Sequence, residues 1–457
     1  MTTNVYLVRS SIIAALGGLL FGFDTAVISG TIDTLEELFA LSPAEKGFTT
    51  ASALIGTIIG AIAVGRPADV WGRRAMMFVL AVLFLVSAIG CALAWDWYSL
   101  LAFRVLGGLG IGGASVVAPM YIAEISPAHM RGRLVALAQF NIVLGILLAF
   151  LSNYLVALAG LGDTQWRVMF GVEALPALAY LLLLVVAPRS PRWLVGVGQD
   201  DSARATLARL GTQEGEIDDQ LETLRDAIRT EKHNLREPFF RGRYRVPITL
   251  AIVIAMFNQL SGINAVLYYA PTIFKSAGLG EQSALLNSVG IGLVNLVTTM
   301  AAIAVIDLIG RKKLMLVGSI GYILSLSAIA WAFYTQGSTT AEGEQTFSSL
   351  GSSTVLVGLV AFIAAHAFGQ GAVIWVFLSE IFPTPVRARG QALGSLTHWV
   401  MAAAISQTFP MIAAQSGGHI FTFYALMMVL QLVWVVFWMP ETRGVSLEKM
   451  HERLGIE

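Results

Sequence analysis

The segment GRPADVWGRR, at residues 65–74, lies between two apolar runs at residues 48–66 and 76–95. Each run is close to the length of about 20 residues that an apolar helix needs to cross a bilayer. Comparable runs recur along the whole chain, which predicts an all-α membrane protein with twelve transmembrane helices. The expected spans are residues 9–30, 48–66, 76–95, 98–120, 134–158, 167–187, 247–274, 283–306, 313–334, 352–378, 390–412 and 419–439.

The composition supports a polytopic membrane protein and excludes several other classes. Hydrophobic residues make up 56% of the 457 residues and charged residues only 13%, whereas an average soluble chain is about 25% charged. The 29 Lys and Arg balance the 29 Asp and Glu, so no basic excess indicates nucleic-acid binding. A single cysteine, Cys91, excludes a disulfide framework and a cysteine-rich metal site.

Basic residues are distributed unevenly between the loops at the two ends of the expected spans. Only Lys46, Arg167 and Lys275 lie in the loops opposite the N-terminus. Apart from Arg104, which lies within a span, every other Lys and Arg is on the N-terminal side. Because cytoplasmic loops carry the excess of Lys and Arg, this asymmetry predicts that both termini are cytoplasmic. The expected location is the cell membrane, plasma or inner, which the chain crosses many times.

Short motifs recur at matching places in the two halves of the chain. DVWGRR at 69–74 follows the second expected span, and DLIGRK at 307–312 follows the eighth. EISP at 124–127 follows the fourth span, and EIFP at 380–383 follows the tenth. Two six-helix halves related by an axis along the membrane normal are typical of transporters, which bind substrate near the midplane between the halves.

This repeat defines the expected domain organisation. We predict two pseudo-symmetric six-helix bundles, joined by a short cytoplasmic helical linker and followed by a cytoplasmic tail. The N-terminal bundle, the linker, the C-terminal bundle and the tail are expected at residues 1–187, 188–246, 247–439 and 440–457.

The repeated loops also combine acids with arginines. Glu124 is followed by Arg131, with which it would pair, and Glu380 and Arg387 repeat this arrangement. Such clusters can act as a latch that holds the cytoplasmic side closed in one state and releases it in another. The alternative is that the arginines only anchor the topology. The predicted latch residues are Asp69, Arg73, Arg74, Glu124, Arg131, Asp307, Arg311, Glu380 and Arg387.

These motifs, together with PRSPRW at 188–193, QLSGIN at 259–264 and PETRG at 440–444, resemble the sugar porter family of the major facilitator superfamily. The family includes the human facilitative glucose transporters and bacterial proton-coupled hexose and xylose symporters. The resemblance extends over about residues 9–445 and implies a major facilitator fold and sugar transport by alternating access. The chain departs from the family at Arg189, where the family usually has Glu.

Two ionisable residues lie within the expected spans. Asp24 is in the first span and Arg104 is near the start of the fourth. A charge in the bilayer costs at least about 2.5 kcal/mol, so such residues are functional candidates. If the helices are neighbours the two side chains can pair, and their separation would switch Asp24 between proton release and proton uptake. The alternative is a static salt bridge that orders the packing.

The resemblance favours proton coupling, because the proton symporters of the family have Asp where Asp24 stands and its uniporters commonly have Asn. Arg104 would modulate the proton affinity of Asp24. Glu124, nearer the cytoplasm, is a candidate for the proton relay or belongs only to the latch.

Neutral hydrogen-bonding side chains lie within several apolar spans. Sugar hydroxyls both donate and accept, so they are matched by amides, and an aromatic ring can cover the C–H face of a sugar. The candidate sugar-binding residues are Gln139, Asn258, Gln259, Asn264, Tyr268, Asn295, Trp375, His398 and Trp399. The alternative for each amide is a hydrogen bond between helices.

The resemblance bears on part of this set. Gln139, Gln259, Asn264, Asn295 and Trp375 match positions that hold the sugar in the family, whereas Asn258 and His398 replace other polar residues. Gly262 and Pro271 are also expected to let the seventh span bend.

The sequence thus predicts a monomeric, proton-coupled importer of a monosaccharide, glucose or a close hexose, with the proton as coupling ion and no cofactor or metal. The alternatives are a proton-independent uniporter, a pentose or polyol symporter, a sugar sensor and a drug/proton antiporter. No nucleotide-binding loop or catalytic constellation indicates an enzyme.

Overall fold

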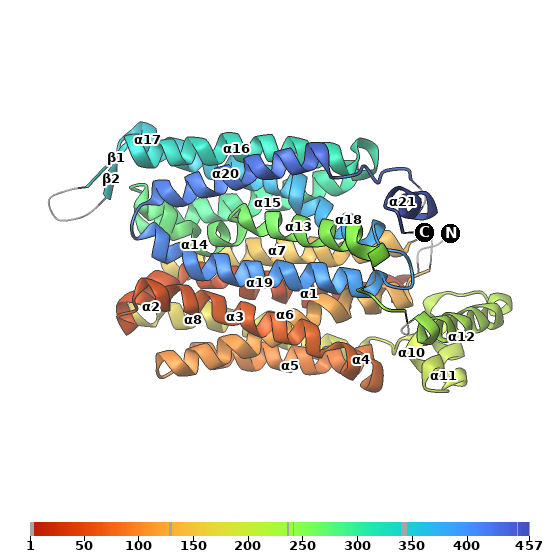
Figure 1. The fold of residues 1–457 in the computed structure, drawn as a ribbon. Coiled ribbons are helices and arrows are strands. Elements are labelled where there is room, and N and C mark those ends of the chain that lie inside the picture. The colour runs from red at the N-terminus through yellow and green to blue at the C-terminus, as the bar shows by residue number, and fades with distance from the viewer. Residues whose placement is uncertain are drawn as a thin grey trace. The chain divides into compact units, whose positions relative to one another are not determined.

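The computed structural model describes residues 4–127, 130–234, 237–240, 242–339, 345–445 and 447–456. Within these residues the chain is almost entirely helical (Figure 1). Contacts between residues divide it into two units. Unit 1 comprises Met1–Thr25, Ser52–Ala149 and Arg167–Glu237, and unit 2 comprises Ala26–Ala51, Phe150–Trp166 and Pro238–Glu457.

The helices have the following bounds. Those before the linker are α1 (Val5–Val27), α2 (Ile32–Phe39), α3 (Pro43–Ala63), α4 (Gly65–Trp71), α5 (Arg73–Ala92), α6 (Trp97–Ile125), α7 (Arg131–Leu158), α8 (Gln165–Val172) and α9 (Ala174–Leu183). Those of the linker are α10 (Pro191–Gly196), α11 (Asp200–Leu210) and α12 (Ile217–Asn234). Those after it are α13 (Arg245–Leu260), α14 (Ile263–Ser276), α15 (Glu281–Ile309), α16 (Arg311–Thr335), α17 (Ser349–His366), α18 (Ala372–Glu380), α19 (Arg387–Ala413), α20 (Gly417–Phe437) and α21 (Leu447–Arg453).

Shorter helical segments join these helices. The single 3₁₀ turns are η1 (Ile28–Gly30), η2 (Gly162–Thr164), η3 (Leu184–Val186), η4 (Glu214–Glu216) and η5 (Gly242–Tyr244). The segment η6 (Ala367–Gly371) is a π-helix between α17 and α18. A π-turn of this kind inserts an extra residue into a helix and is frequent at functional sites.

Eleven segments of the described residues are long and apolar enough to cross a membrane. They coincide with eleven of the twelve expected spans. The remaining expected span, residues 390–412, lies in α19, which has 27 residues but carries more polar side chains, among them His398, Ser406 and Gln407. The prediction of a polytopic all-α membrane protein is therefore confirmed.

One element departs from an all-helical chain. Between α16 and α17, β1 (Gly337–Thr339) pairs antiparallel with β2 (Gln345–Phe347), with Gly337 opposite Phe347. The expected spans gave no sign of this short hairpin, because each strand has only three residues and lies outside the apolar runs.

Small residues allow α3 and α6 to pack closely in unit 1. Cβ atoms added at Gly56 or Gly60 would collide with the backbone carbonyls of Val105 and Leu109, and one added at Gly108 would collide with that of Ala53. Close approach of backbones through small residues is a common way for helices to associate in lipid, where the hydrophobic effect no longer drives packing.

Glycines end α4, the short helix after the second span, and α15, which forms the eighth span. Gly72, between α4 and α5, has φ +91° and ψ 152°, and Gly310, between α15 and α16, has φ +103° and ψ 154°. Only glycine adopts this backbone region readily. The repeated glycine therefore turns the chain so that Arg73 and Arg311 each begin a new helix.

The seventh expected span is interrupted, as predicted. It consists of α13 and α14, which meet at Gly262 with φ +85°. A second irregularity falls at Tyr269, with φ −116° and ψ 17°, two residues before Pro271. Proline cannot donate the helical hydrogen bond and crowds the preceding turn, which explains the kink.

Each unit has a hydrophobic core of its own. In unit 1 the buried cluster includes Phe84, Tyr121 and Tyr180. A smaller cluster around Leu207 and Leu221 packs the three linker helices together. The corresponding cluster in unit 2 includes Phe377, Phe382, Val435 and Met439.

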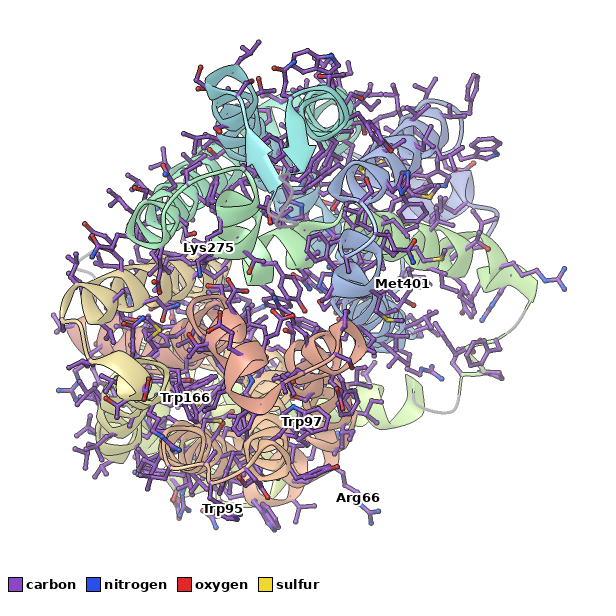
Figure 2. All side chains as sticks on the ribbon, turned by 90° about the vertical axis from the view of Figure 1, so that its left-hand side faces the viewer. Arg66, Trp95, Trp97, Trp166, Lys275 and Met401 are labelled. Carbon is purple, nitrogen blue, oxygen red and sulfur yellow. The ribbon has the colours of Figure 1, made fainter. Side chains whose placement is uncertain are left out.

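Tryptophans mark the end of unit 1 that faces the viewer in Figure 2. Trp95 lies in the turn between α5 and α6, Trp97 begins α6, and Trp95 is 76% exposed. Tryptophan is enriched at the boundary between the hydrocarbon core and the headgroups of a membrane. This turn is therefore suited to the membrane surface.

Candidate functional site

Asp24 on α1 and Arg104 on α6 form a buried ion pair in unit 1. The two side chains are 1% and 2% exposed, and Arg104 Nη1 contacts Asp24 Oδ1. The other carboxylate oxygen, Asp24 Oδ2, has no hydrogen-bond partner among the described residues. The pairing expected from the sequence is therefore present, with one oxygen of Asp24 left unsatisfied.

A second buried acid, Glu173, lies close to this pair and was not among the expected site residues. It precedes α9, is 2% exposed, and lies close enough to Asp24 and Arg104 to interact with both electrostatically. Its Oε1 atom has no hydrogen-bond partner in the described part of the chain. Two carboxylates thus share one guanidinium. The signal in the sequence was an acid within the expected span 167–187, the same criterion that selected Asp24.

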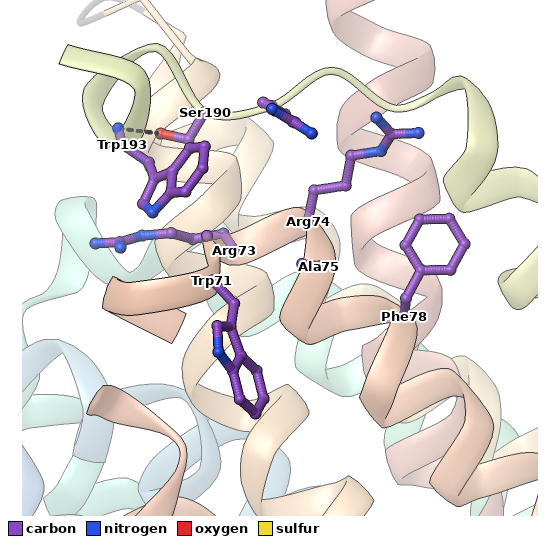
Figure 3. A pocket seen from close by; sticks show the side chains of 9 residues that line it. Trp71, Arg73, Arg74, Ala75, Phe78, Ser190 and Trp193 are labelled. Atoms are coloured by element: carbon purple, nitrogen blue, oxygen red, sulfur yellow. Dashed lines mark hydrogen bonds between the residues drawn. The ribbon is translucent and has the colours of Figure 1, made fainter. Parts of the chain in front are cut away.

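Glu124 belongs to a different cluster of unit 1, near the linker. Arg73 Nη2 lies 3.0 Å from Glu124 Oε1, and its Nη1 lies 2.9 Å from Asp69 Oδ1. The Ser190 hydroxyl donates to Glu124 Oε2 at 2.5 Å. Figure 3 shows Arg73 beside Trp193, whose backbone N–H donates to Ser190 Oγ. Glu124 thus joins the predicted latch residues Asp69 and Arg73 rather than the Asp24 pair.

Unit 2 repeats this cluster. Arg311 Nη2 lies 2.7 Å from Glu380 Oε1, and Arg311 Nη1 lies 2.8 Å from Asp307 Oδ1. Glu441 accepts from the backbone N–H groups of Arg311 and Lys312 at 3.0 and 3.1 Å. A carboxylate at the first turn of α16 is favourable because it satisfies free N–H groups at the positive end of the helix.

The predicted pairs Glu124/Arg131 and Glu380/Arg387 are wrong. Within the described residues Arg131 is exposed and forms no ion pair, and Arg387 donates to Phe382 O and Thr384 Oγ1. The acids pair instead with Arg73 and Arg311, because these arginines begin α5 and α16 beside them and are buried there. Among the described residues Arg74 also pairs with no acid; it donates to the carbonyls of Leu184 and Val185 at 3.2 and 2.7 Å.

The neutral polar residues of unit 2 form a directed chain of hydrogen bonds. Gln259 Nε2 donates to Asn258 Oδ1 at 2.9 Å, and Asn258 Nδ2 donates to Gln370 Oε1 at 3.4 Å. Gln370 Nε2 donates to Gln431 Oε1 at 2.6 Å, and Gln431 Nε2 donates to Ser319 Oγ at 2.7 Å. Each amide therefore donates in the same direction along the chain.

This chain crosses several elements and is fully buried. Its members come from α13, η6, α20 and α16, and none is more than 2% exposed. Gln370, Gln431 and Ser319 were not predicted site residues, although Gln370 and Gln431 lie in expected spans, where an amide is an evident signal. The sequence could not indicate that η6 turns Gln370 toward both neighbours.

Because every amide in this series of hydrogen bonds donates in the same direction, particular polar atoms near its first member, Gln259, remain unpaired. Gln259 Oε1 and Asn264 Nδ2 are buried and have no hydrogen-bond partner among the described residues. The Nε2 group of Gln259 already has partners: it donates to Asn258 Oδ1 and lies 3.2 Å from a nitrogen of the His398 ring. The arrangement therefore presents one unpaired acceptor and one unpaired donor on either side of the break at Gly262.

Aromatic side chains surround His398. The ring of Trp375 lies 5.2 Å from that of His398, and the ring of Trp399 lies 4.7 Å from it at nearly a right angle. Trp375 is half-exposed, Tyr268 is buried on α14, and Trp399 is buried on α19. Asn258, Gln259, His398 and Trp375 are thus brought together as neighbours.

For two predicted residues, no contact with this group is recorded within the described part of the chain. Asn295 on α15 is buried and accepts from Thr299 Oγ1 of its own helix at 3.4 Å. Gln139 is half-buried on α7, in unit 1. Their predicted part in sugar binding stays a prediction.

Two of the three basic residues in the loops opposite the N-terminus, Lys46 and Lys275, bind the same acid in unit 2. Asp33 Oδ1 lies 3.0 Å from Lys46 Nζ, and Asp33 Oδ2 lies 3.1 Å from Lys275 Nζ; Figure 2 labels Lys275. Thr272 Oγ1 also donates to Asp33 at 2.7 Å. Burial alone would raise the pKa of Asp33, but the two ammonium groups hold it below its ordinary value.

Comparison with known proteins identifies the class. The family model described as sugar (and other) transporter matches residues 10–454. A glucose transport protein of Synechocystis sp. is 36% identical, with 98% of each chain covered. The D-xylose-proton symporter of Escherichia coli K12 is also 36% identical, over 97% of this chain and 95% of that protein.

Solved structures agree with this classification. The xylose transporter XylE from E. coli, in a partially occluded inward-open conformation, has a TM-score of 0.82 at 35% identity, covering 96% of this chain and 99% of its own. The chain therefore belongs to the sugar transporter family and has the major facilitator fold. It is a multi-pass membrane transporter and not an enzyme.

Proposed function

We propose that this protein imports a monosaccharide together with a proton by alternating access, with glucose or a close hexose as substrate. Relatives named as a glucose transport protein and as a D-xylose-proton symporter support a sugar and a proton as the transported species. A pentose is the second candidate, because relatives named for D-xylose and arabinose are similarly close.

The observation that carries proton coupling is the group of Asp24, Arg104 and Glu173. Its two carboxylates face one guanidinium in a buried region. An uncompensated buried charge is costly, so one bound proton would neutralise the group. In the paired state Arg104 compensates one of the two carboxylates, and a single proton would neutralise the other. A movement that separates Asp24 from Arg104 then favours proton uptake by Asp24.

The start of the amide chain supports sugar binding. A hydroxyl donates one hydrogen bond and accepts others, so neighbouring hydroxyls can satisfy Gln259 Oε1 and Asn264 Nδ2 at once. In this proposal the two buried atoms gain hydrogen-bond partners only when a ligand supplies them. An unsatisfied buried polar atom costs about 1–3 kcal/mol, so such a ligand would be bound favourably. His398, Trp375 and Trp399 would contribute further contacts, as would Gln139, Asn295 and Tyr268.

The remaining elements of the proposal concern orientation and gating. We propose that both termini face the cytoplasm, as the Lys and Arg distribution predicts. The Arg73–Glu124 and Arg311–Glu380 clusters would then lie at the cytoplasmic ends of the helices and act as the latch. The transporter would act as a monomer in the bilayer, with the proton as its coupling ion and no cofactor.

Transport in proteoliposomes tests the proposal. Counterflow with labelled glucose, galactose, xylose and polyols identifies the substrate, and accumulation under an inward proton gradient measures coupling. We expect Asp24→Asn to retain counterflow and lose accumulation, whereas Asp163→Asn, which changes an exposed acid, retains both. Undiminished accumulation by Asp24→Asn would exclude its role. Wild-type counterflow without any accumulation would instead establish the proton-independent uniporter.

A further inference from the structure

A basic cavity lies in unit 1, near the linker and beside the Arg73–Glu124 cluster. It has a volume of about 460 Å³ and opens between α1, α5, α11 and the segment from η3 to α10. Its lining includes four arginines and no carboxylate: Arg9, Arg74, Arg189 and Arg209. The volume falls within the range of about 300–1,000 Å³ that is typical of ligand sites.

The four arginines are positioned by groups that do not neutralise them. The guanidinium carbons of Arg9 and Arg209 lie 5.4 and 4.5 Å from the centre of the Tyr6 ring. That of Arg189 lies 5.8 Å from the Trp193 ring. Arg74 donates to two backbone carbonyls. Within the described residues none of the four forms an ion pair with a carboxylate.

The neighbouring hollow brings the same cations together with aromatic side chains. Arg74 and Arg189 also line a space of about 200 Å³ with Trp71, Phe78 and Trp193. Figure 3 shows Arg74 extending from α5 toward the linker segment, between Phe78 and Trp193. Arg189, the residue at which the chain departs from its family, therefore adds a cation to a site that already holds three.

An apolar groove adjoins the basic cavity at Arg9. Its volume is about 560 Å³, and its other lining residues are Val5, Val8, Ile12, Ile13 and Leu183. It runs between α1 and the end of α9. Val5 and Ile12 are 80% and 47% exposed, so the groove is open along the surface of α1. A basic cavity joined to an apolar groove fits a ligand with an anionic head and a hydrocarbon chain.

We propose that this site binds an anionic phospholipid, with the phosphate headgroup among the four arginines and an acyl chain along the groove between α1 and α9. Arginine forks donate paired hydrogen bonds to phosphate oxygens. The cytoplasmic leaflet is rich in anionic lipids, and basic pockets at that face bind their headgroups. A zwitterionic headgroup carries an ammonium group of its own, which the arginines repel. The site therefore selects phosphatidylglycerol over phosphatidylcholine.

Native mass spectrometry of the full chain, purified in detergent, counts bound lipid directly. The titrants are phosphatidylglycerol, phosphatidylcholine, soluble glycerophosphoglycerol and inorganic phosphate. We expect phosphatidylglycerol to bind about tenfold or more tightly than phosphatidylcholine, and neither soluble phosphate compound to compete at equal concentration. These two comparisons distinguish a lipid from a free phosphate.

Matched variants place the lipid in the cavity. Arg9→Gln/Arg189→Gln/Arg209→Gln should weaken phosphatidylglycerol binding about tenfold or more. A control with the same loss of charge, Arg66→Gln/Arg133→Gln/Arg229→Gln, changes exposed arginines outside the cavity and should bind as the wild type does. The single variant Arg189→Glu serves if the triple variant does not fold, and should also lose selectivity for the anionic lipid.

Three results would overturn the proposal. Equal binding of both lipids would exclude selection by charge. Equally effective competition by glycerophosphoglycerol or phosphate would make the cavity an anion site without a lipid. An equal loss in the control variant would show that binding depends on overall charge rather than on these arginines. Placing the site at the cytoplasmic face rests on the orientation proposed above, but none of these measurements uses sugar transport, so their failure and that of the proposed transport are distinguishable.

Discussion

Replacing Arg104 by Gln isolates the electrostatic role of the buried group in unit 1. The substitution removes the only cation that pairs with Asp24 in the described structure, and leaves Asp24 and Glu173 as two buried carboxylates. Removing one partner of a buried ion pair costs about 3–5 kcal/mol. Coulomb's law gives a similar value, about 4 kcal/mol for unit charges about 4 Å apart at an effective dielectric of about 20. We expect the free energy of unfolding to fall by about 3–5 kcal/mol at pH 7.

Two further substitutions test whether stability depends on the net charge of this group. In the Arg104→Gln background, Asp24→Asn leaves a single carboxylate that one proton can neutralise, so part of the lost stability should return. Glu173→Gln in the wild type leaves a balanced Asp24–Arg104 pair, so it should cost less than about 1 kcal/mol. The ordering of the variants therefore follows the net charge of the group rather than the number of contacts removed.

Denaturant unfolding of purified protein, followed by circular dichroism, measures these differences. Arg133→Gln is the control, because Arg133 is exposed on α7 and a surface substitution should change stability by about 0.5 kcal/mol at most. Lowering the pH should rescue Arg104→Gln, since protons can then bind the uncompensated carboxylates. The reasoning fails if Arg104→Gln is no less stable than Arg133→Gln, or if Asp24→Asn destabilises it further.

Three further predictions test other parts of the structure. Gln370→Leu leaves Asn258 Nδ2 and Gln431 Oε1 unpaired; uptake kinetics should show a KM raised about tenfold at a nearly unchanged maximal rate, and an unchanged KM would contradict this. Asp33→Asn should lower the free energy of unfolding by about 1–3 kcal/mol. Because Lys46 and Lys275 lower the pKa of Asp33, its contribution is complete above about pH 3.9 and is lost only as pH falls through the lower folded value. A Tm difference between Asp33→Asn and wild type that varies from pH 8 to 5 would speak against it. Gly72→Ala should cost about 1–3 kcal/mol because of its positive φ, whereas Gly65→Ala, which has open space around it, should be tolerated in the same unfolding assay.

The sequence predicted most of the fold because span length and apolar composition are local properties. Eleven expected spans needed only a count of apolar residues. The exception, α19, is more polar along its length, although residues 390–412, which were also identified as an apolar run, contain no Asp, Glu, Lys or Arg. The π-turn η6 and the β1–β2 hairpin had no comparable signal, since both depend on tertiary contacts rather than on a periodic pattern.

The ion-pair partners of the candidate residues were harder to predict than the residues themselves. A charge inside a span is costly, so Asp24 and Arg104 could be selected from sequence, and Glu173 met the same criterion. The acids of the EISP and EIFP motifs were assigned to the next arginine along the chain, at Arg131 and Arg387. Their actual partners, Arg73 and Arg311, lie far away in sequence and are brought close by the turns at Gly72 and Gly310.

The Asp24 group of unit 1 and the amide chain of unit 2 differ in their chemistry, and this difference bears on the proposed division of labour. Unit 1 buries two carboxylates with one guanidinium, a group whose net charge changes when a proton binds. The chain from Gln259 to Ser319 in unit 2 consists of neutral amides and a hydroxyl, which offer donors and acceptors and do not titrate near pH 7. A charged group beside the sugar hydroxyls would make sugar affinity depend directly on pH. In the proposed mechanism, proton binding belongs to unit 1 and most of the hydrogen-bond matching to unit 2, so that each can be optimised separately and their coupling is left to the movement of the helices.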